Sequence, residues 1–222
     1  MFPPFPEELA RSYALQIKDS LPECLNGKMI GVLVCKDSEE NLVYLKAFSG
    51  QVKGNWLLDG FVPPLLDVDS YNNVVAKNDK EIHILSAEIE SLEQECKILL
   101  KEQESVLKEN PKNATRSNPA ILIQHKIQEK KSERRKLSNE SLKAIYNLFR
   151  VHCIDSSVKT FKDIFGDFLP PTGTGECCAP KLLNYAFKCN LHPVSLCEFY
   201  YGKGIRQEGI FIPPAMKNVA RF

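Results

Sequence analysis

Two adjacent cysteines lie before an expected helix and are candidates for thiol chemistry. Cys177 and Cys178 follow the loop Gly173-Thr174-Gly175 and precede Pro180, a residue type suited to the first turn of a helix. The dipole at a helix N-terminus lowers the pKa of a nearby thiol. A nucleophilic cysteine also needs a histidine base, and no motif links a histidine to this loop. The pattern therefore favours a structural turn. The histidines are His83, His125, His152 and His192.

The same loop is a candidate for phosphate binding, because glycines that enter a helix expose backbone N–H groups. Neither of the fuller phosphate-binding patterns, G-x-x-x-x-G-K-[ST] or G-x-G-x-x-G, is present. We therefore interpret Gly173 and Gly175 as residues of a tight turn and expect no bound cofactor.

A zinc site of the nucleobase-deaminase type is the sharpest alternative for this region. Those enzymes place a histidine or cysteine two residues before a catalytic glutamate at a helix start, followed later by Pro-Cys-x-x-Cys. Here Ala179 stands where the glutamate would be, and no cysteine follows Pro214. No C-x-x-C pair occurs anywhere in the chain. We expect no catalytic residue and no metal, and an inactive deaminase-like domain remains the alternative reading.

Composition limits the possible partners and compartments. The 29 basic and 28 acidic residues balance, so the whole molecule is not expected to attract nucleic acid. No apolar run approaches the roughly 18–20 residues of a membrane span, so no membrane partner is expected. The first residues lack the features of a signal peptide, and the eight cysteines are therefore expected to be reduced thiols in the cytoplasm.

A heptad repeat dominates the middle of the chain and predicts a long helix. From Ile82 to Val106 the repeat positions alternate in spacing between three and four residues, and only Gln103 is polar. The segment 110–119 contains two prolines and must end this helix. A second helix is predicted over Ala120–Val151. The repeat positions are Ile82, Leu85, Ile89, Leu92, Cys96, Leu99, Gln103 and Val106, and the looser stripe of the second helix is Ile123, Ile127, Leu137, Leu142, Ile145 and Leu148.

The two predicted helices carry opposite charge. Residues 79–108 contain eight acidic residues and four lysines, whereas residues 120–150 contain eight basic residues and three glutamates. The charges and the short linker predict an antiparallel pair within one chain. We expect residues 79–139 to form an insertion between the two parts of a core domain, 1–78 and 140–222.

The rest of the chain alternates short helical and strand patterns. A helix is predicted over Glu7–Asp19, and the runs Met29–Cys35 and Leu42–Ser49 predict a β-hairpin. Further strands are predicted at Val194–Tyr201 and Ile210–Ile212. The expected fold is α+β, with a small mixed or antiparallel sheet, packed helices and a long inserted antiparallel helical hairpin of the coiled-coil type.

A basic run on the second helix offers a candidate RNA contact. Lysine and arginine side chains bind RNA phosphates, and five residues of this run are candidate RNA-binding residues. No aromatic residue for base stacking lies among them, and pairing with the acidic helix is the competing interpretation. The candidates are Lys126, Lys130, Lys131, Arg134 and Arg135.

Five segments, in order along the chain, resemble a known family. They are Ile30–Val34, Leu45–Gly50, Gly60–Leu65, Pro170–Ala186 and Glu198–Gly202, and the longest reads PPTGTGECCAPKLLNYA. Together they resemble the N-terminal extension found in a subgroup of RluA-type RNA pseudouridine synthases. The resemblance covers nearly the whole chain, including the charged helical insertion.

The resemblance implies a noncatalytic role for this chain. In that family the catalytic domain follows the extension and isomerises uridine with the aspartate of a His-Arg-Leu-Asp motif, which is absent here. The implied role is an RNA-positioning or docking module whose partners are a downstream catalytic domain and ribosomal or transfer RNA. No activity is expected from this chain alone, which would be an accessory domain, a chain cut before the catalytic part, or the product of a split gene.

Overall fold

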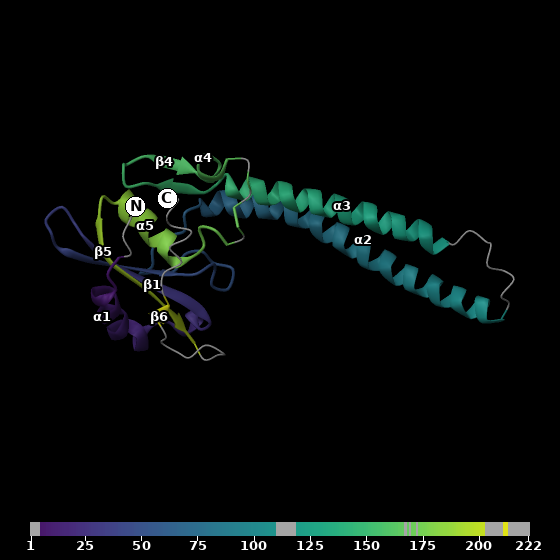
Figure 1. The fold of residues 1–222 in the computed structure, drawn as a ribbon, viewed down its shortest axis with the longest axis horizontal. Coiled ribbons are helices and arrows are strands. Elements are labelled where there is room, and N and C mark those ends of the chain that lie inside the picture. The colour runs from purple at the N-terminus through teal and green to yellow at the C-terminus, as the bar shows by residue number, and fades with distance from the viewer. Residues whose placement is uncertain are drawn as a thin grey trace. The chain divides into compact units, whose positions relative to one another are not determined.

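The computed structural model describes residues 5–109, 119–166, 168, 170–171, 173–202 and 211–212. The chain divides into two compact units. The core unit comprises Met1–Val68 and Tyr146–Phe222, and the helical unit comprises Asp69–Ile145 (Figure 1). The helical unit thus begins earlier and ends later than the insertion 79–139 that was expected from the sequence.

An antiparallel sheet organises the core unit. Its strands are β1 (Lys28–Lys36), β2 (Leu42–Phe48), β5 (His192–Tyr201) and β6 (Phe211–Ile212), in the order β2-β1-β5-β6. Each neighbouring pair is antiparallel, and β1 and β2 form the predicted hairpin with Ile30 opposite Phe48. The α+β fold class is confirmed, with an antiparallel sheet.

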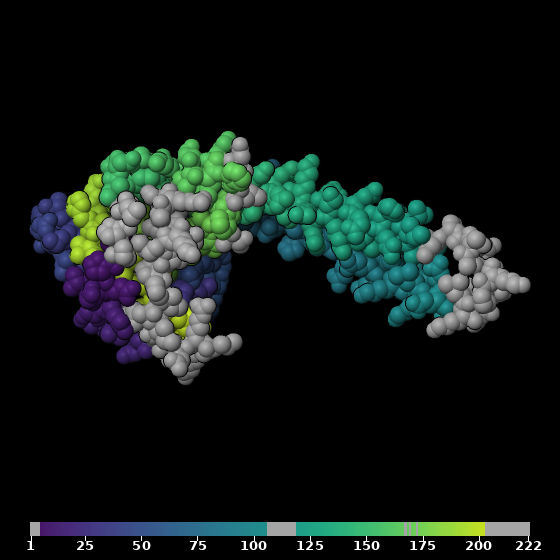
Figure 2. Space-filling view, viewed as in Figure 1, coloured from purple at the N-terminus to yellow at the C-terminus, as the bar shows by residue number. Residues whose placement is uncertain are grey.

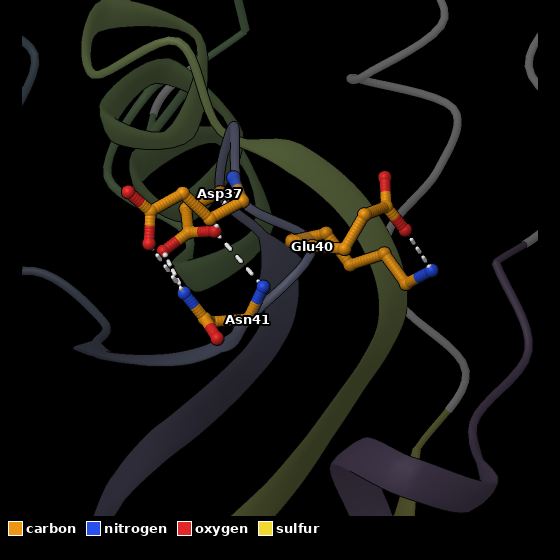
Figure 3. A network of polar contacts seen from close by, with 5 residues as sticks. Asp37, Glu40 and Asn41 are labelled. Carbon is orange, nitrogen blue, oxygen red and sulfur yellow. Dashed lines mark hydrogen bonds and ion pairs between the residues drawn. The ribbon is translucent and has the colours of Figure 1, made fainter.

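The turn between β1 and β2 is held by one carboxylate. Asp37 Oδ1 accepts hydrogen bonds of 2.9 Å from the backbone N–H groups of Glu39 and Asn41, and the Asn41 side chain donates to Oδ2 (Figure 3). These bonds hold the pKa of Asp37 below its ordinary value, and the bond from the Asn41 backbone has the largest effect. Lys36 pairs with Glu40, which adopts the left-handed conformation that closes the turn. The polar run after β1 therefore folds as a local turn.

Helices cover both faces of this sheet. Helix α1 (Glu8–Ile17) packs Ala10 and Ala14 against the face that carries Val32 and Val34. Helix α5 (Cys178–Lys188) packs on the opposite face, which carries Leu33 (Figure 1). Because both faces of β1 are buried, its sequence is a continuous apolar run rather than an alternating one. Two 3₁₀ turns, Lys18–Ser20 and Glu23–Leu25, join α1 to β1.

A second small hairpin corrects the predicted end of the basic helix. Helix α3 (Pro119–Tyr146) stops before Val151, because Arg150–His152 forms strand β3 and pairs with β4 (Val158–Thr160). Val151 and Phe149 are buried in the core unit, where the Phe149 ring stacks on Phe161 with centroids 4.3 Å apart. Tertiary packing thus outweighs the helical pattern there. Helix α4 (Phe161–Phe165) follows, with a capping box made by Thr160 and Asp163.

The helical unit is an antiparallel pair, as predicted. Helices α2 (Val68–Glu109) and α3 run side by side (Figure 1), and the Cys96 thiol lies 4.0 Å from the Ala120 carbonyl oxygen. Leu85, Ile89 and Cys96 of the predicted heptad repeat are buried. Leu92 and Leu99, two further positions of the repeat, are half-buried. Val106 and the linker 110–118 lie outside the residues whose side chains are described.

Helix α2 begins well before the predicted position. Tyr71, Val75 and Asn78 continue the heptad spacing that reaches Ile82, and all four are half-buried. The sequence obscured this start, since the polar Asn78 interrupts the apolar row. Among the described residues, no helix combines the length and the apolar character that a membrane span requires.

The heptad seam should supply most of the stability of the hairpin. We expect Ile89→Asp to destabilise the helical unit by more than about 3 kcal/mol, because it places a carboxylate in the cluster that contains Ile123 and Ile127. Ile98→Asp is the matched control, since Ile98 is 58% exposed, and should cost no more than about 0.5 kcal/mol. Far-ultraviolet circular dichroism during urea unfolding measures both values. Equal losses would show that the seam does not hold the helices together.

Candidate functional site

The structure buries Cys178, the first residue of α5, and leaves the N-cap residue Cys177 half-buried. Cys178 is 1% exposed, and its thiol donates a hydrogen bond to the Met29 carbonyl oxygen at 3.2 Å. Burial, reinforced by the carboxylate of Glu198, raises the pKa of Cys178 well above its ordinary value. Burial also raises the pKa of Cys177. Both shifts oppose the effect of the helix dipole, so neither thiol is activated as a nucleophile.

Gly31 of the neighbouring strand β1 has no side chain, and this allows the close packing. A Cβ atom on Gly31 would lie 2.5 Å from Cys178 Cβ and 2.9 Å from Leu182 Cδ1. Gly31 occupies the middle of β1, where glycine is otherwise unfavourable. Its presence is explained by the approach of α5 to the sheet. Cys178 therefore belongs to the packing between α5 and β1.

The N-terminus of α5 already has an anionic partner. Glu198 of β5 is 6% exposed, and its Oε1 accepts a hydrogen bond of 3.0 Å from the backbone N–H of Ala179. A phosphate at this helix terminus would meet that carboxylate. The Gly173–Gly175 loop instead forms turns closed by Thr174 N–H to Pro171 and Glu176 N–H to Gly173. This supports the structural interpretation of the loop.

A buried lysine next to these cysteines was not anticipated. Lys181 is 1% exposed, and its Nζ donates hydrogen bonds to the carbonyl oxygens of Phe48 at 2.9 Å and Gly50 at 3.0 Å. The ammonium also lies 4.9 Å from the Phe48 ring centroid and 5.4 Å from that of Trp56. Burial lowers the pKa of Lys181 to about 8. Lys181 thus joins α5 to the end of β2 and the segment that follows it.

The histidines do not complete a catalytic or metal site in the described residues. His152 is held by Asn184 of α5, whose Oδ1 accepts the His152 backbone N–H at 2.7 Å and lies 3.3 Å from Nδ1. His83, His125 and His192 are exposed. Within the described ranges, no group of three or more histidine, cysteine or acidic side chains comes together as a metal site.

Three of the five candidate RNA-binding residues face α2. Lys130 Nζ lies 2.9 Å from Glu88 Oε2, and Lys131 Nζ lies 2.7 Å from Glu93 Oε1. The hydrogen bond to Glu88 raises the pKa of Lys130. Arg134 donates to Ser86 Oγ at 3.4 Å. These cations support the pairing of the two helices.

The spacing of α3 contained a signal for this arrangement. Lys130 and Arg134 continue the alternation of three and four residues set by Ile123 and Ile127. They occupy seam positions and are half-buried, as is Leu137 one step further. Spacing indicated their location, whereas charge alone suggested an exposed surface.

The remaining candidates, Lys126 and Arg135, are exposed. Arg135 lies in a shallow depression of about 430 Å³ on α3. Its other lining residues are Ser132, Lys136, Asn139, Glu140 and Lys143. Figure 2 shows one face of α3 in teal and green. We call Arg135, Lys136 and Lys143 the outer basic patch. Of these three residues, only Arg135 is among the candidates predicted from the sequence.

Comparison with protein-family models, with curated proteins and with solved structures finds no match to this chain.

Proposed function

We propose that this chain is a noncatalytic RNA-positioning or docking module of an RluA-type RNA pseudouridine synthase. In this role it holds ribosomal or transfer RNA for a separate catalytic domain that isomerises uridine. The five segments that resemble the N-terminal extension of such enzymes support the proposal.

All eight cysteines are free thiols, which fits a reducing compartment, and we propose the cytoplasm.

The outer basic patch is the observation that carries the RNA-binding part of the proposal. Arg135, Lys136 and Lys143 are exposed and have no acidic partner among the described residues. Such cations can release the counterions of RNA phosphates on binding. The hydroxyl of Ser132 and the amide of Asn139 add hydrogen-bonding groups to the same depression. The depression has no aromatic lining residue, which favours contact with the RNA backbone over base stacking.

Removing the patch should weaken RNA binding and its dependence on salt. For the variant R135Q/K136Q/K143Q we expect affinity for labelled transfer RNA or ribosomal RNA fragments to fall about tenfold or more. The slope of log affinity against log salt concentration should become shallower by about 3, since three phosphate contacts are lost. Fluorescence anisotropy at several salt concentrations measures both quantities.

The control variant is K130Q/K131Q, which removes two cations already paired with Glu88 and Glu93. It should leave the salt slope nearly unchanged. An unchanged slope in R135Q/K136Q/K143Q would contradict RNA binding by the patch. Formation of pseudouridine by the pure chain would contradict a noncatalytic role.

A further inference from the structure

Helix α2 carries a second regular row beside its buried seam. Glutamates recur at every seventh residue over four heptads, and the residue three positions after each is alternately isoleucine and serine. All eight side chains are exposed, including Ile84 at 50% and Ile98 at 58%. Residues at this spacing lie along one side of a helix. The row comprises Glu81, Ile84, Glu88, Ser91, Glu95, Ile98, Glu102 and Ser105.

Among the described residues, only one glutamate of this row forms an ion pair within the hairpin. Glu88 pairs with Lys130, whereas no ion pair joins Glu81, Glu95 or Glu102 to another described residue. Ile84 and Ile98 lie outside the apolar cluster of the seam. The row therefore offers both charge and apolar surface to another molecule.

A groove between α2 and α3 lies at the Glu81 end of the row. Its volume is about 310 Å³, and Ile84, Leu85 and Leu137 provide its apolar lining. Leu85 is buried and Leu137 half-buried, so Ile84 is the apolar side chain most accessible to a ligand. The groove is large enough to accept apolar side chains of a partner.

The charged lining of the groove is acidic. Glu81, Glu133 and Glu140 contribute three carboxylates, of which Glu133 pairs with Lys130 at 3.6 Å, and Lys136 is the single cation in the lining. The groove shares Lys136 and Glu140 with the depression of the outer basic patch, but its remaining charged lining is acidic, so the groove itself does not favour the phosphates of a nucleic acid. It favours a ligand that combines lysine or arginine with apolar side chains.

We propose that this groove and the row along α2 dock a basic amphipathic helix of a partner protein. Apolar side chains of the partner contact Ile84 and Ile98, and its lysines or arginines face the glutamates. The seven-residue recurrence matches the repeat of a helix that lies along α2. A second copy of α2 would present the same acidic row, so like charges disfavour that occupant. This interaction goes beyond the proposed RNA contact and uses a different class of ligand.

The test uses the full chain and a synthetic helix as the probe. The probe has leucine at the a and d positions of four heptads and lysine at e and g, and a second peptide has glutamate in place of each lysine. Fluorescence anisotropy should show binding of the lysine peptide and at least about tenfold weaker binding of the glutamate peptide. Comparable affinity for the two peptides would overturn the proposal.

Matched variants locate the binding surface. E81Q/E140Q should weaken binding of the lysine peptide about three- to tenfold, since two ion pairs are lost. E90Q/E104Q removes the same charge from exposed positions outside the row and should change affinity less than about twofold. Equal weakening by both variants would mean nonspecific attraction to an acidic helix, and the proposal would fail.

An apolar substitution tests the groove separately from charge. Ile84→Ser introduces the residue type found at Ser91 and Ser105 and should weaken binding about fivefold. Ile121→Ser, at a residue of α3 that is also 50% exposed, should have little effect. Sedimentation of the chain without peptide supplies a further outcome. A dimer that Ile84→Ser dissociates would assign the groove to a second copy and overturn the proposal.

Discussion

Gly175→Ala should destabilise the core unit by about 2–5 kcal/mol, whereas Gly173→Ala in the same loop should cost about 1–2 kcal/mol. Both glycines adopt a left-handed backbone, with φ of +83° at Gly175 and +81° at Gly173. The conformational penalty of a side chain is therefore similar at the two positions. The difference in space around them should separate the two variants.

Aromatic rings surround only one of these glycines. A Cβ on Gly175 would lie 2.7 Å from Phe149 Cε1 and 2.8 Å from Phe161 Cζ, whereas a Cβ on Gly173 would meet nothing within 4 Å. Phe149 and Phe161 are 2% and 1% exposed and stacked, so they have little room to move. Overpacking of this kind costs about 1–3 kcal/mol beyond the backbone strain.

The fluorescence of Trp56 provides the measurement. Trp56 is the only tryptophan of the chain and is buried in the core unit, so its emission during urea unfolding follows that unit. Phe161→Leu in the Gly175→Ala background should recover part of the loss, because a smaller side chain relieves the crowding. Equal free energies of unfolding for the two alanine variants would show that the rings do not constrain the loop.

The sequence predicted those features whose cause is local. The apolar run at Ile30–Cys35 and the heptad spacing from Ile82 to Leu99 reflect burial that repeats along one element, and both elements form as expected. The positions of Lys130 and Arg134 in the seam follow the same periodicity. Their charge led to the RNA hypothesis, although their spacing matched that of Ile127.

Features that depend on contacts distant in sequence could not be predicted. Glu198 caps the helix that begins at Cys178 only because β5 and α5 pack together, and no local pattern indicates that contact. The strand at Arg150–His152 replaces the end of a helix because the core unit buries Phe149 and Val151. The role of Lys181 was hidden for the same reason, since its carbonyl partners lie more than a hundred residues earlier in the chain.

Lys181→Met should remove a rise in the stability of the core unit between pH 8 and 10.5. The pKa of Lys181 is about 8 in the folded chain, against an ordinary value of 10.5. Between these values the unfolded chain binds a proton that the folded chain does not, so stability increases with pH. Below pH 8 both states are protonated, and the full cost of burying the ammonium is present.

The size of the effect follows from the same shift. The contribution of Lys181 should increase the free energy of unfolding by about 2–3 kcal/mol from pH 8 to 10.5. Buried thiols act in the opposite direction, because burial raises the pKa of Cys35 and Cys197 to about 12. Their folded forms keep protons that the unfolded chain loses, and stability falls as pH rises above 9. These thiols are common to both proteins, so the difference between wild type and Lys181→Met isolates the lysine.

Urea unfolding followed by Trp56 fluorescence at several pH values tests this expectation. The difference in unfolding free energy, wild type minus Lys181→Met, should grow with pH across the interval. Lys188→Met is the matched control, because Lys188 is exposed near the end of the same helix and should give a flat difference. The loss of hydrogen bonds to Phe48 and Gly50 adds a constant offset, since those carbonyl groups do not titrate. If the free energies of unfolding of wild type and Lys181→Met vary with pH in parallel, these carbonyls and the two aromatic rings keep the ammonium charged across the whole interval. In that case Lys181 would be a permanently charged link between α5 and the end of β2.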